Sequence, residues 1–190
     1  MNEMTLRWPQ VFRRLARDRR GVSAVEFALL APVMIALYLG CVEISDGVSA
    51  NRKVSLTAAT LANLATQVAT ISSSDMTNIL NASSAIIAPY SASNLKATLS
   101  CLKIDSTGKV TVAWSATLNG SARAAGSAIT IPSALIPPST SLPAQLLFSE
   151  VNYAYTPTVG YTITGTLNLS DKMYMSPRIT PPTYGTTACS

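Results

Sequence analysis

The sequence predicts an α+β protein in which one long N-terminal helix packs on a small antiparallel sheet of about four strands. Three patterns indicate this fold class. A nearly uncharged apolar stretch covers residues 22–42, apolar residues recur at mostly three- and four-residue spacing over 48–71, and alternating segments begin at Lys96. The first pattern predicts the transmembrane half of the long helix and the second predicts its amphipathic half, while the third predicts the sheet.

Residues 1–21 form a basic leader. They contain six of the 14 basic residues of the chain against two acids, Glu3 and Asp18, so +4 of the net charge of +5 lies here. A nucleic-acid-binding protein spreads its basic charge over a folded surface, and we therefore expect no nucleic acid as a partner. Basic residues that precede an apolar span favour a cytoplasmic location, so we expect a cytoplasmic leader and an exported remainder.

Residues 22–42 are predicted to cross the lipid bilayer once, because 21 helical residues span about 30 Å, the thickness of the hydrocarbon core. Glu26 is the only charged residue of this span. A cleaved secretory signal fits less well, because its apolar region has only about 7–15 residues. Lipoprotein processing at Cys41 is a weaker alternative, since Tyr38 stands where such sites prefer Leu.

Beyond the span, residues 43–71 are predicted to continue as a helical stalk whose apolar stripe packs on its own domain. Residues 72–190 are predicted to form an α+β head. Its expected elements are a helix over 75–87 opened by Ser74-Asp75, strands over 96–105, 109–119, 145–156 and 165–175, a loop over 120–144 with a short helical turn, and an irregular tail over 177–190.

The composition argues against an enzyme. Histidine is absent, which excludes Ser-His-Asp and Cys-His nucleophiles and His-ligated zinc, and three cysteines cannot form a four-thiolate metal site. The exported residues Asp105, Glu150, Asp171 and Lys172 form no recognisable catalytic constellation. We therefore expect no catalytic residues, no cofactor and no metal.

Two separated motifs resemble one known family. The segment RRGVSAVEFALLAPVMIALYLGCVEI, residues 19–44, resembles the N-terminal segment of the TadE-like proteins, minor pilins (pseudopilins) of the Tad or Flp (tight adherence) system within the type IV pili. The stretch Glu150–Ile179 is similar to the closing module of that family, through its Tyr-x-Tyr-x-Pro and Ser-Pro-Arg signatures.

The resemblance implies a pilin-like fold, a structural role in pilus assembly, and a place in the bacterial inner membrane with a periplasmic head. It also allows incorporation into the extracellular pilus. The partners it implies are a prepilin peptidase, other Tad pilins and pseudopilins, and the inner-membrane pilus assembly complex. An uncleaved single-pass scaffold of the same machinery is the alternative.

The resemblance also implies cleavage after Gly21, which makes Val22 the new N-terminus and Glu26 the fifth residue of the mature chain. A carboxylate in a membrane helix costs about 2.5–3.5 kcal/mol. Pairing with the Val22 ammonium of a neighbouring subunit would offset this cost at one axial offset only, so Glu26 is expected to set the register of assembly. A shallow Glu26 that reaches the lipid headgroups is the alternative.

Pro32 is expected to kink the helix, because proline removes a backbone hydrogen bond. The kink either assists extraction from the membrane and filament packing or is passive.

Cysteine counting predicts a disulfide between the two exported cysteines, Cys101 and Cys189, with Cys41 left in or beside the membrane. The alternative is two unpaired thiols.

Overall fold

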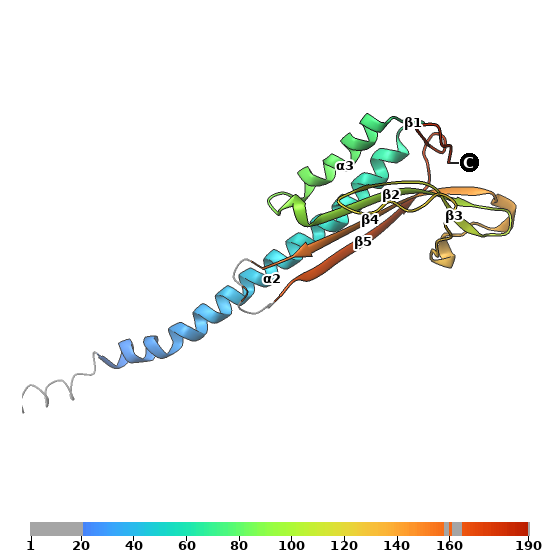
Figure 1. Cartoon of the computed structure of the whole chain (residues 1–190). Coiled ribbons are helices and arrows are strands. Elements are labelled where there is room, and N and C mark those ends of the chain that lie inside the picture. The colour runs from blue at the N-terminus through green and yellow to red at the C-terminus, as the bar shows by residue number, and fades with distance from the viewer. Residues whose placement is uncertain (1–20, 158–159, 161–164, 190) are drawn as a thin grey trace, which may run out of the picture.

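The computed structural model describes residues 21–157, 160 and 165–189; the leader arginines lie outside the described residues. It confirms the predicted fold class, since one long helix packs on a four-stranded antiparallel sheet (Figure 1). The elements in chain order are α2 (Val22–Thr66), β1 (Thr70–Ile71), α3 (Ser73–Ile87), η2 (Ala92–Asn94), β2 (Leu95–Ile104), β3 (Val110–Leu118), η3 (Ser133–Leu135), η4 (Ser139–Ser141), β4 (Ala144–Tyr155), β5 (Leu167–Met175) and β6 (Thr183–Tyr184).

Helix α2 is a single element of 45 residues. One side of its C-terminal half is buried, and the buried side chains are small or aliphatic and recur at helical spacing: Ala50, Val54, Ala58, Leu61, Ala62 and Ala65. Small side chains at these positions allow the sheet to approach the helix closely. The helix ends at Thr66, five residues before the end that the apolar repeat predicts, because Thr70 and Ile71 pair in parallel with β6 instead. Ile71 is fully buried in this strand pairing.

Helix α3 lies along α2 (Figure 1). Its N-cap is Ser72, two residues before the expected cap, and Ser72 and Asp75 form a reciprocal capping box. The backbone N–H of Asp75 donates to Ser72 Oγ at 3.1 Å, and the N–H of Ser72 donates to Asp75 Oδ2 at 3.1 Å. The Ser72 hydroxyl also donates to Asp75 Oδ2 at 2.6 Å, and this hydrogen bond, together with the one from the Ser72 N–H, lowers the pKa of Asp75. Near the end of α3, Lys53 Nζ of α2 donates to the Ile86 carbonyl at 3.1 Å, so the two helices are joined by a polar contact as well.

The sheet has the strand order β3-β2-β4-β5, and all three pairings are antiparallel. All four predicted strands are present. One face of the sheet packs on the helices through Leu95, Ala97 and Leu99 of β2. A register shift between Cys101 and Leu102 in the β2–β3 ladder places Val110 and Val112 of β3 on the opposite face of the sheet from Trp114. As a result, an apolar cluster forms on the opposite, outer face.

The outer apolar cluster is covered by the segment 129–142, which was expected to be a loop with a short helical turn and contains the two turns η3 and η4. The covered residues are Leu102, Ile104, Val110, Val112, Leu146 and Phe148. The head therefore has one core between sheet and helices and a smaller one on the other face of the sheet.

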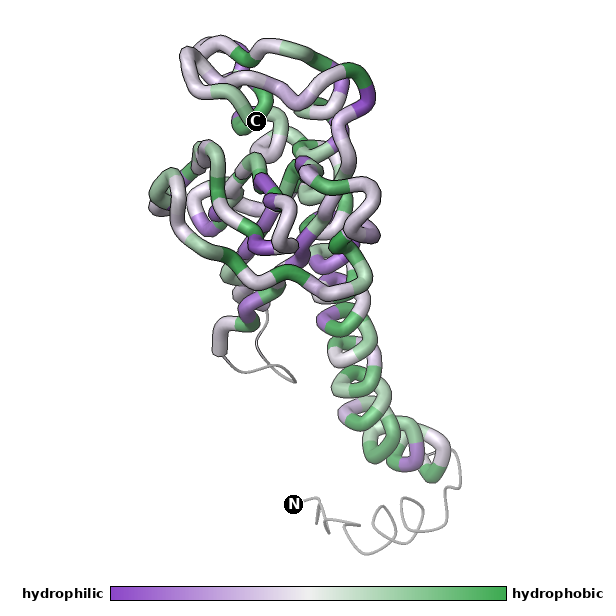
Figure 2. The backbone as a smooth tube through the Cα atoms, turned by 90° about the vertical axis from the view of Figure 1, so that its right-hand side faces the viewer, coloured by the Kyte–Doolittle hydropathy of each residue, from purple (hydrophilic) through white to green (hydrophobic). Residues whose placement is uncertain are grey.

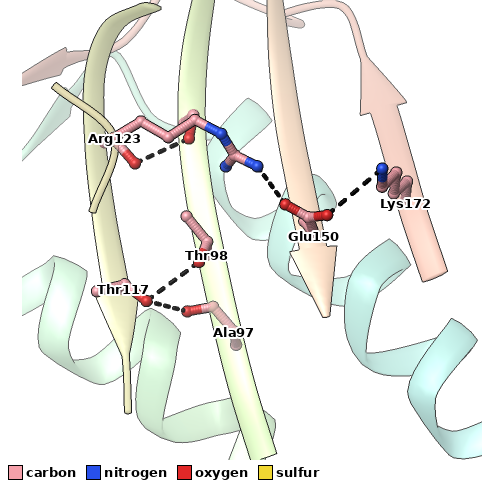
Figure 3. A network of polar contacts seen from close by, with 8 residues as sticks. Ala97, Thr98, Thr117, Arg123, Glu150 and Lys172 are labelled. Carbon is pink, nitrogen blue, oxygen red and sulfur yellow. Dashed lines mark hydrogen bonds and ion pairs between the residues drawn. The ribbon is translucent and has the colours of Figure 1, made fainter. Parts of the chain in front are cut away.

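A charged cluster joins the loop that follows β3 to the outer face of the sheet (Figure 3). Glu150 of β4 forms ion pairs with Arg123 and, at 3.5 Å, with Lys172 of β5. The Arg123 guanidinium also lies 5.1 Å from the centroid of the Phe148 ring, which stacks on Tyr174 with centroids 4.6 Å apart. Arg123 thus covers an aromatic pair while it neutralises a mostly buried carboxylate.

The C-terminal tail is more ordered than its irregular composition indicates. The backbone N–H of Arg178 donates to the Thr66 carbonyl at 3.3 Å, at the end of α2, and Trp114 Nε1 donates to the Pro182 carbonyl at 3.0 Å. Cys189 forms a disulfide with Cys101 of β2, with their Cα atoms 5.9 Å apart. Strand β6 pairs with β1 just beyond the C-terminal end of α2, and this disulfide joins the last part of the tail to the sheet (Figure 1).

We predict that Cys189→Ser lowers the free energy of unfolding by about 4–5 kcal/mol, because the disulfide closes a loop with a sequence separation of 88. Denaturant unfolding of the oxidised full chain in detergent measures this loss. Alkylation followed by mass spectrometry should label Cys41 alone in the wild-type protein. Labelling of all three cysteines without reductant would contradict the pairing.

We predict that Glu150→Gln lowers the free energy of unfolding by about 1.5–3 kcal/mol, because it removes the charge that holds the Arg123 guanidinium in a partly buried position. The matched variant Lys172→Met should cost at most about 1 kcal/mol, since its side chain is 56% exposed. Denaturant unfolding of both variants checks the order, and equal losses would show that the Arg123 contact is not the dominant one.

Candidate membrane-spanning and assembly segment

The N-terminal half of α2 stands apart from the head. Residues 22–39 include no buried side chain, and large apolar residues are exposed all around the helix, for example Phe27 at 69%, Leu29 at 71% and Tyr38 at 69%. Figure 2 shows this apolar half projecting from the head. The core helix of a soluble protein would be mostly buried, whereas only 11% of the most apolar window is buried here. This half therefore needs a lipid or protein environment that the described chain does not itself supply.

The free segment has the length of a membrane crossing. Residues 22–39 extend about 27 Å at 1.5 Å per residue, close to the roughly 30 Å of the hydrocarbon core. The first buried residues of α2 are Gly40 and Glu43, so the head begins to pack where the predicted span ends. The helix is long and apolar enough to cross a membrane, and the protein is membrane-associated through it.

Gly21 is the N-cap of α2 and makes no side-chain capping bond. No atom of the described residues lies within 4 Å of the position that a Cβ would take at Gly21, so the described chain leaves the bond between Gly21 and Val22 open. Val22 is the first residue of the helix, and Glu26 follows about one turn later on the same side. These three residues are therefore grouped at the extreme end of the free segment.

Glu26 lies on the exposed surface of α2, and no hydrogen bond or ion pair joins it to another described residue. Pro32 lies inside the helix, which continues through it as one element. Because proline has no backbone N–H, the Ala28 carbonyl lacks its usual helical donor. The Glu26 carboxylate and the Ala28 carbonyl are thus polar groups that need further partners, beyond those the described residues supply, when this segment is in lipid.

Three tyrosines hold the head on α2 just beyond the free segment. Tyr90 donates from its hydroxyl to the Asp46 carbonyl at 3.0 Å, and its ring lies 6.3 and 6.0 Å from the rings of Tyr153 and Tyr155. Burial raises the pKa of Tyr90, with a further contribution from the Asp46 charge. Burial likewise raises the pKa of Tyr155, and Asp46 and Glu43 add to it. The hydroxyls therefore remain protonated at neutral pH, and that of Tyr90 serves as a donor.

The contacts explain what the two C-terminal signatures do in the fold. The Tyr-x-Tyr pair, Tyr153 and Tyr155, is buried in the core against α2, and a Cβ added at Gly47 would lie 3.8 Å from Tyr155 Cε1. Ser-Pro-Arg ends with Arg178, whose backbone contacts Thr66 at the other end of the buried half of α2. The sequence did not show that these motifs contact the helix; the alternation of Val151, Tyr153 and Tyr155 was the signal that they share one face of β4.

The other candidate residues are dispersed. Cys101 and Cys189 are at the opposite end of the head from Gly21 and Glu26. Asp105 caps the β2–β3 turn, where its carboxylate accepts from the Thr107 hydroxyl at 2.6 Å and from the backbone N–H groups of Lys109 and Thr107 at 3.0 and 2.8 Å. These hydrogen bonds, first of all the one from the Thr107 hydroxyl, lower the pKa of Asp105. Glu150 and Lys172 meet in the charged cluster, a pairing that sequence reasoning missed. In the described parts of the chain, no three His, Cys, Asp or Glu residues are placed to hold a metal ion.

Comparison with known families supports the resemblance of the N-terminal segment to TadE-like proteins. The model of the TadE-like protein family matches residues 21–63, from the N-cap of α2 almost to its end. No curated protein and no solved structure matched the chain. The stretch Glu150–Ile179 lies outside the matched range, so its similarity to the closing module stays a prediction. The helix that begins after Gly21 is a TadE-like segment, as the motif at residues 19–44 predicts.

Proposed function

We propose that this protein is a minor prepilin-like subunit of a Tad (Flp) pilus, cleaved after Gly21 by a prepilin peptidase and acting structurally in pilus assembly. The TadE-like segment relates the chain to the Tad pilus system. The observation that carries the proposal is the free apolar half of α2, which has an open glycine at its start and one carboxylate a turn later. A helix of this kind can insert in a membrane and later pack against the helices of other subunits.

The proposed topology places the leader in the cytoplasm and the head in the periplasm. The basic residues of the leader favour the cytoplasmic side, and Glu43 and Asp46 follow the span on the other side. The Cys101–Cys189 disulfide supports this orientation, because disulfides persist in oxidising compartments such as the periplasm.

Glu26 is proposed to act in registration between subunits. Cleavage creates an ammonium group at Val22, and Glu26 of an adjacent subunit can pair with it at only one axial offset of the two helices. Since the carboxylate is exposed on a helix that the head does not cover, a neighbouring helix can reach it without rearrangement of the head. Other Tad pilins and pseudopilins and the inner-membrane assembly complex are the proposed partners.

The second candidate function is an uncleaved single-pass scaffold of the pilus machinery. The observation in its favour is that the same free helix anchors the head in the membrane whether or not the leader is removed.

We predict that Gly21→Phe blocks removal of the leader, because a peptidase acting at the membrane boundary needs a small residue there. The matched variant Gly21→Ala should still be cleaved. N-terminal sequencing of the protein extracted from piliated cells should give Val22 first for the wild type and Met1 for Gly21→Phe. A wild-type protein that begins at Met1 would instead favour the scaffold.

We predict that Glu26→Ala leaves membrane insertion intact and abolishes incorporation into the pilus or its assembly complex, because the registering ion pair is lost. Membrane fractionation measures insertion, and co-purification with sheared pili measures incorporation. Asp46→Asn is the matched control, since it removes a carboxylate beyond the span and keeps the oxygen that faces Tyr90. Normal piliation with Glu26→Ala would show that registration does not depend on this carboxylate.

A further inference from the structure

A polar pocket lies on the outer face of the sheet, away from the helices. Its volume is about 310 Å³, and it is lined by Asn94, Lys96, Asn152, Tyr153, Ala154 and Asn168. Small-molecule sites in proteins begin at about 300 Å³, so the pocket has room for one small ligand. Its lining comes from η2, β2, β4 and β5, which are fixed to each other by the sheet.

The strand register brings the polar residues together. Lys96 of β2 is the direct partner of Asn152 on β4, and Asn168 of β5 is the partner of Ala154, two residues further along. Cross-strand partners share a face, and so do alternate residues along a strand. Lys96, Asn152 and Asn168 therefore point to the same side of the sheet, within reach of one ligand.

The floor of the pocket is rigid. Tyr153 is 4% exposed, and with its partner Leu95 it belongs to the core between the sheet and α2. The side-chain oxygen of Asn94 accepts a hydrogen bond from Ser93 Oγ at 3.4 Å, so one carboxamide is already oriented. These contacts fix the pocket before any ligand arrives, which lowers the cost of binding.

The other polar groups of the pocket are available. The side chains of Lys96, Asn152 and Asn168 are exposed, and none makes a hydrogen bond or ion pair to another residue in the described ranges. Lys96 is the only charged residue of the lining, so the pocket is positive. Glu150, an acid on the same face of β4, is already paired with Arg123 and Lys172.

We propose that this pocket binds an acidic sugar residue. The sugar carboxylate pairs with the Lys96 ammonium, and ring hydroxyls exchange hydrogen bonds with the carboxamides of Asn94, Asn152 and Asn168, which both donate and accept. This binding does not depend on cleavage after Gly21.

The surroundings favour a sugar over other anions. Lipid headgroups at the end of the span would meet the exposed carboxylate of Asp46, which repels anionic headgroups. A nucleic acid would need several cations and exposed aromatic rings for stacking, whereas the pocket offers one cation and a buried tyrosine. Carboxamides beside a single ammonium match a small polyhydroxylated anion.

The test is ligand-observed NMR titration of the full-length protein in detergent with methyl glucuronide and with methyl glucoside, which has the same ring without the carboxylate. We expect saturable binding of the glucuronide at a millimolar Kd, and about tenfold weaker binding of the glucoside. Lys96→Met should reduce glucuronide affinity to that of the glucoside, and Asn152→Ala should weaken both. Lys109→Met is the matched control, because Lys109 is exposed in the β2–β3 turn at the far end of β2.

Three results would overturn the proposal: no saturable glucuronide binding, glucuronide binding that Lys96→Met leaves unchanged, or an equal loss with Lys109→Met. Phosphatidylglycerol vesicles form a second arm, with phosphatidylcholine vesicles for comparison. Lys96-dependent binding to the former without glucuronide binding would assign the pocket to a lipid headgroup and also reject the sugar. Circular dichroism of each variant confirms folding, and because all three altered side chains are exposed, we expect unchanged spectra.

Discussion

The packing of the C-terminal half of α2 against the sheet is the interaction on which the rest of the structure depends. Small residues at helical spacing, with Ala50, Ala58 and Ala65 fully buried, let the helix approach β4 and β5 closely. Because α2 is a single helix, this contact also fixes the direction in which the free N-terminal half leaves the head. A membrane-spanning segment attached in this way cannot swing independently without breaking the helix.

The head holds the helix at two separated levels. Near the predicted membrane boundary, Tyr155 packs beside Gly47, and Tyr90 donates to the Asp46 carbonyl while its ring lies against those of Tyr153 and Tyr155. At the far end, the tail contacts the Thr66 carbonyl and is joined to β2 by the disulfide. Contacts at two levels along α2 resist both tilting and sliding of the helix relative to the head. The proposed role as an assembly subunit, pulled through its N-terminal helix, would require such an attachment. The charged cluster around Glu150 has a different role, since through Arg123 it attaches the loop that follows β3 to the outer face of the sheet.

The free half of α2 combines properties that would be unfavourable in a soluble protein. It exposes large apolar side chains and contains a proline. It also carries the Glu26 carboxylate, which has no ion-pair partner among the described residues. The exposed apolar side chains would be unfavourable in water, and the carboxylate and the proline would be unfavourable in lipid. All three are explained if the segment exchanges a lipid environment for the helices of neighbouring subunits. The proposed sugar pocket lies on the opposite face of the sheet from α2, so it would remain accessible while the helix is buried in an assembly.

The sequence alone determined the long helix, its apolar first half, the four strands of the sheet and the grouping of Gly21, Val22 and Glu26. These features depend on residues that are neighbours along the chain, and local periodicity records such neighbours directly. Tertiary structure decided where α2 ends, because Ile71 fits a helical repeat equally well but is buried by pairing with β6. It also decided the pairing of Glu150 with Arg123 and the contacts of Tyr153 and Tyr155 with α2. The convergence of four polar residues on one pocket depends on it as well: Asn94, Lys96, Asn152 and Asn168. These contacts join residues far apart in sequence, and they follow from strand order and register, which no local pattern specifies.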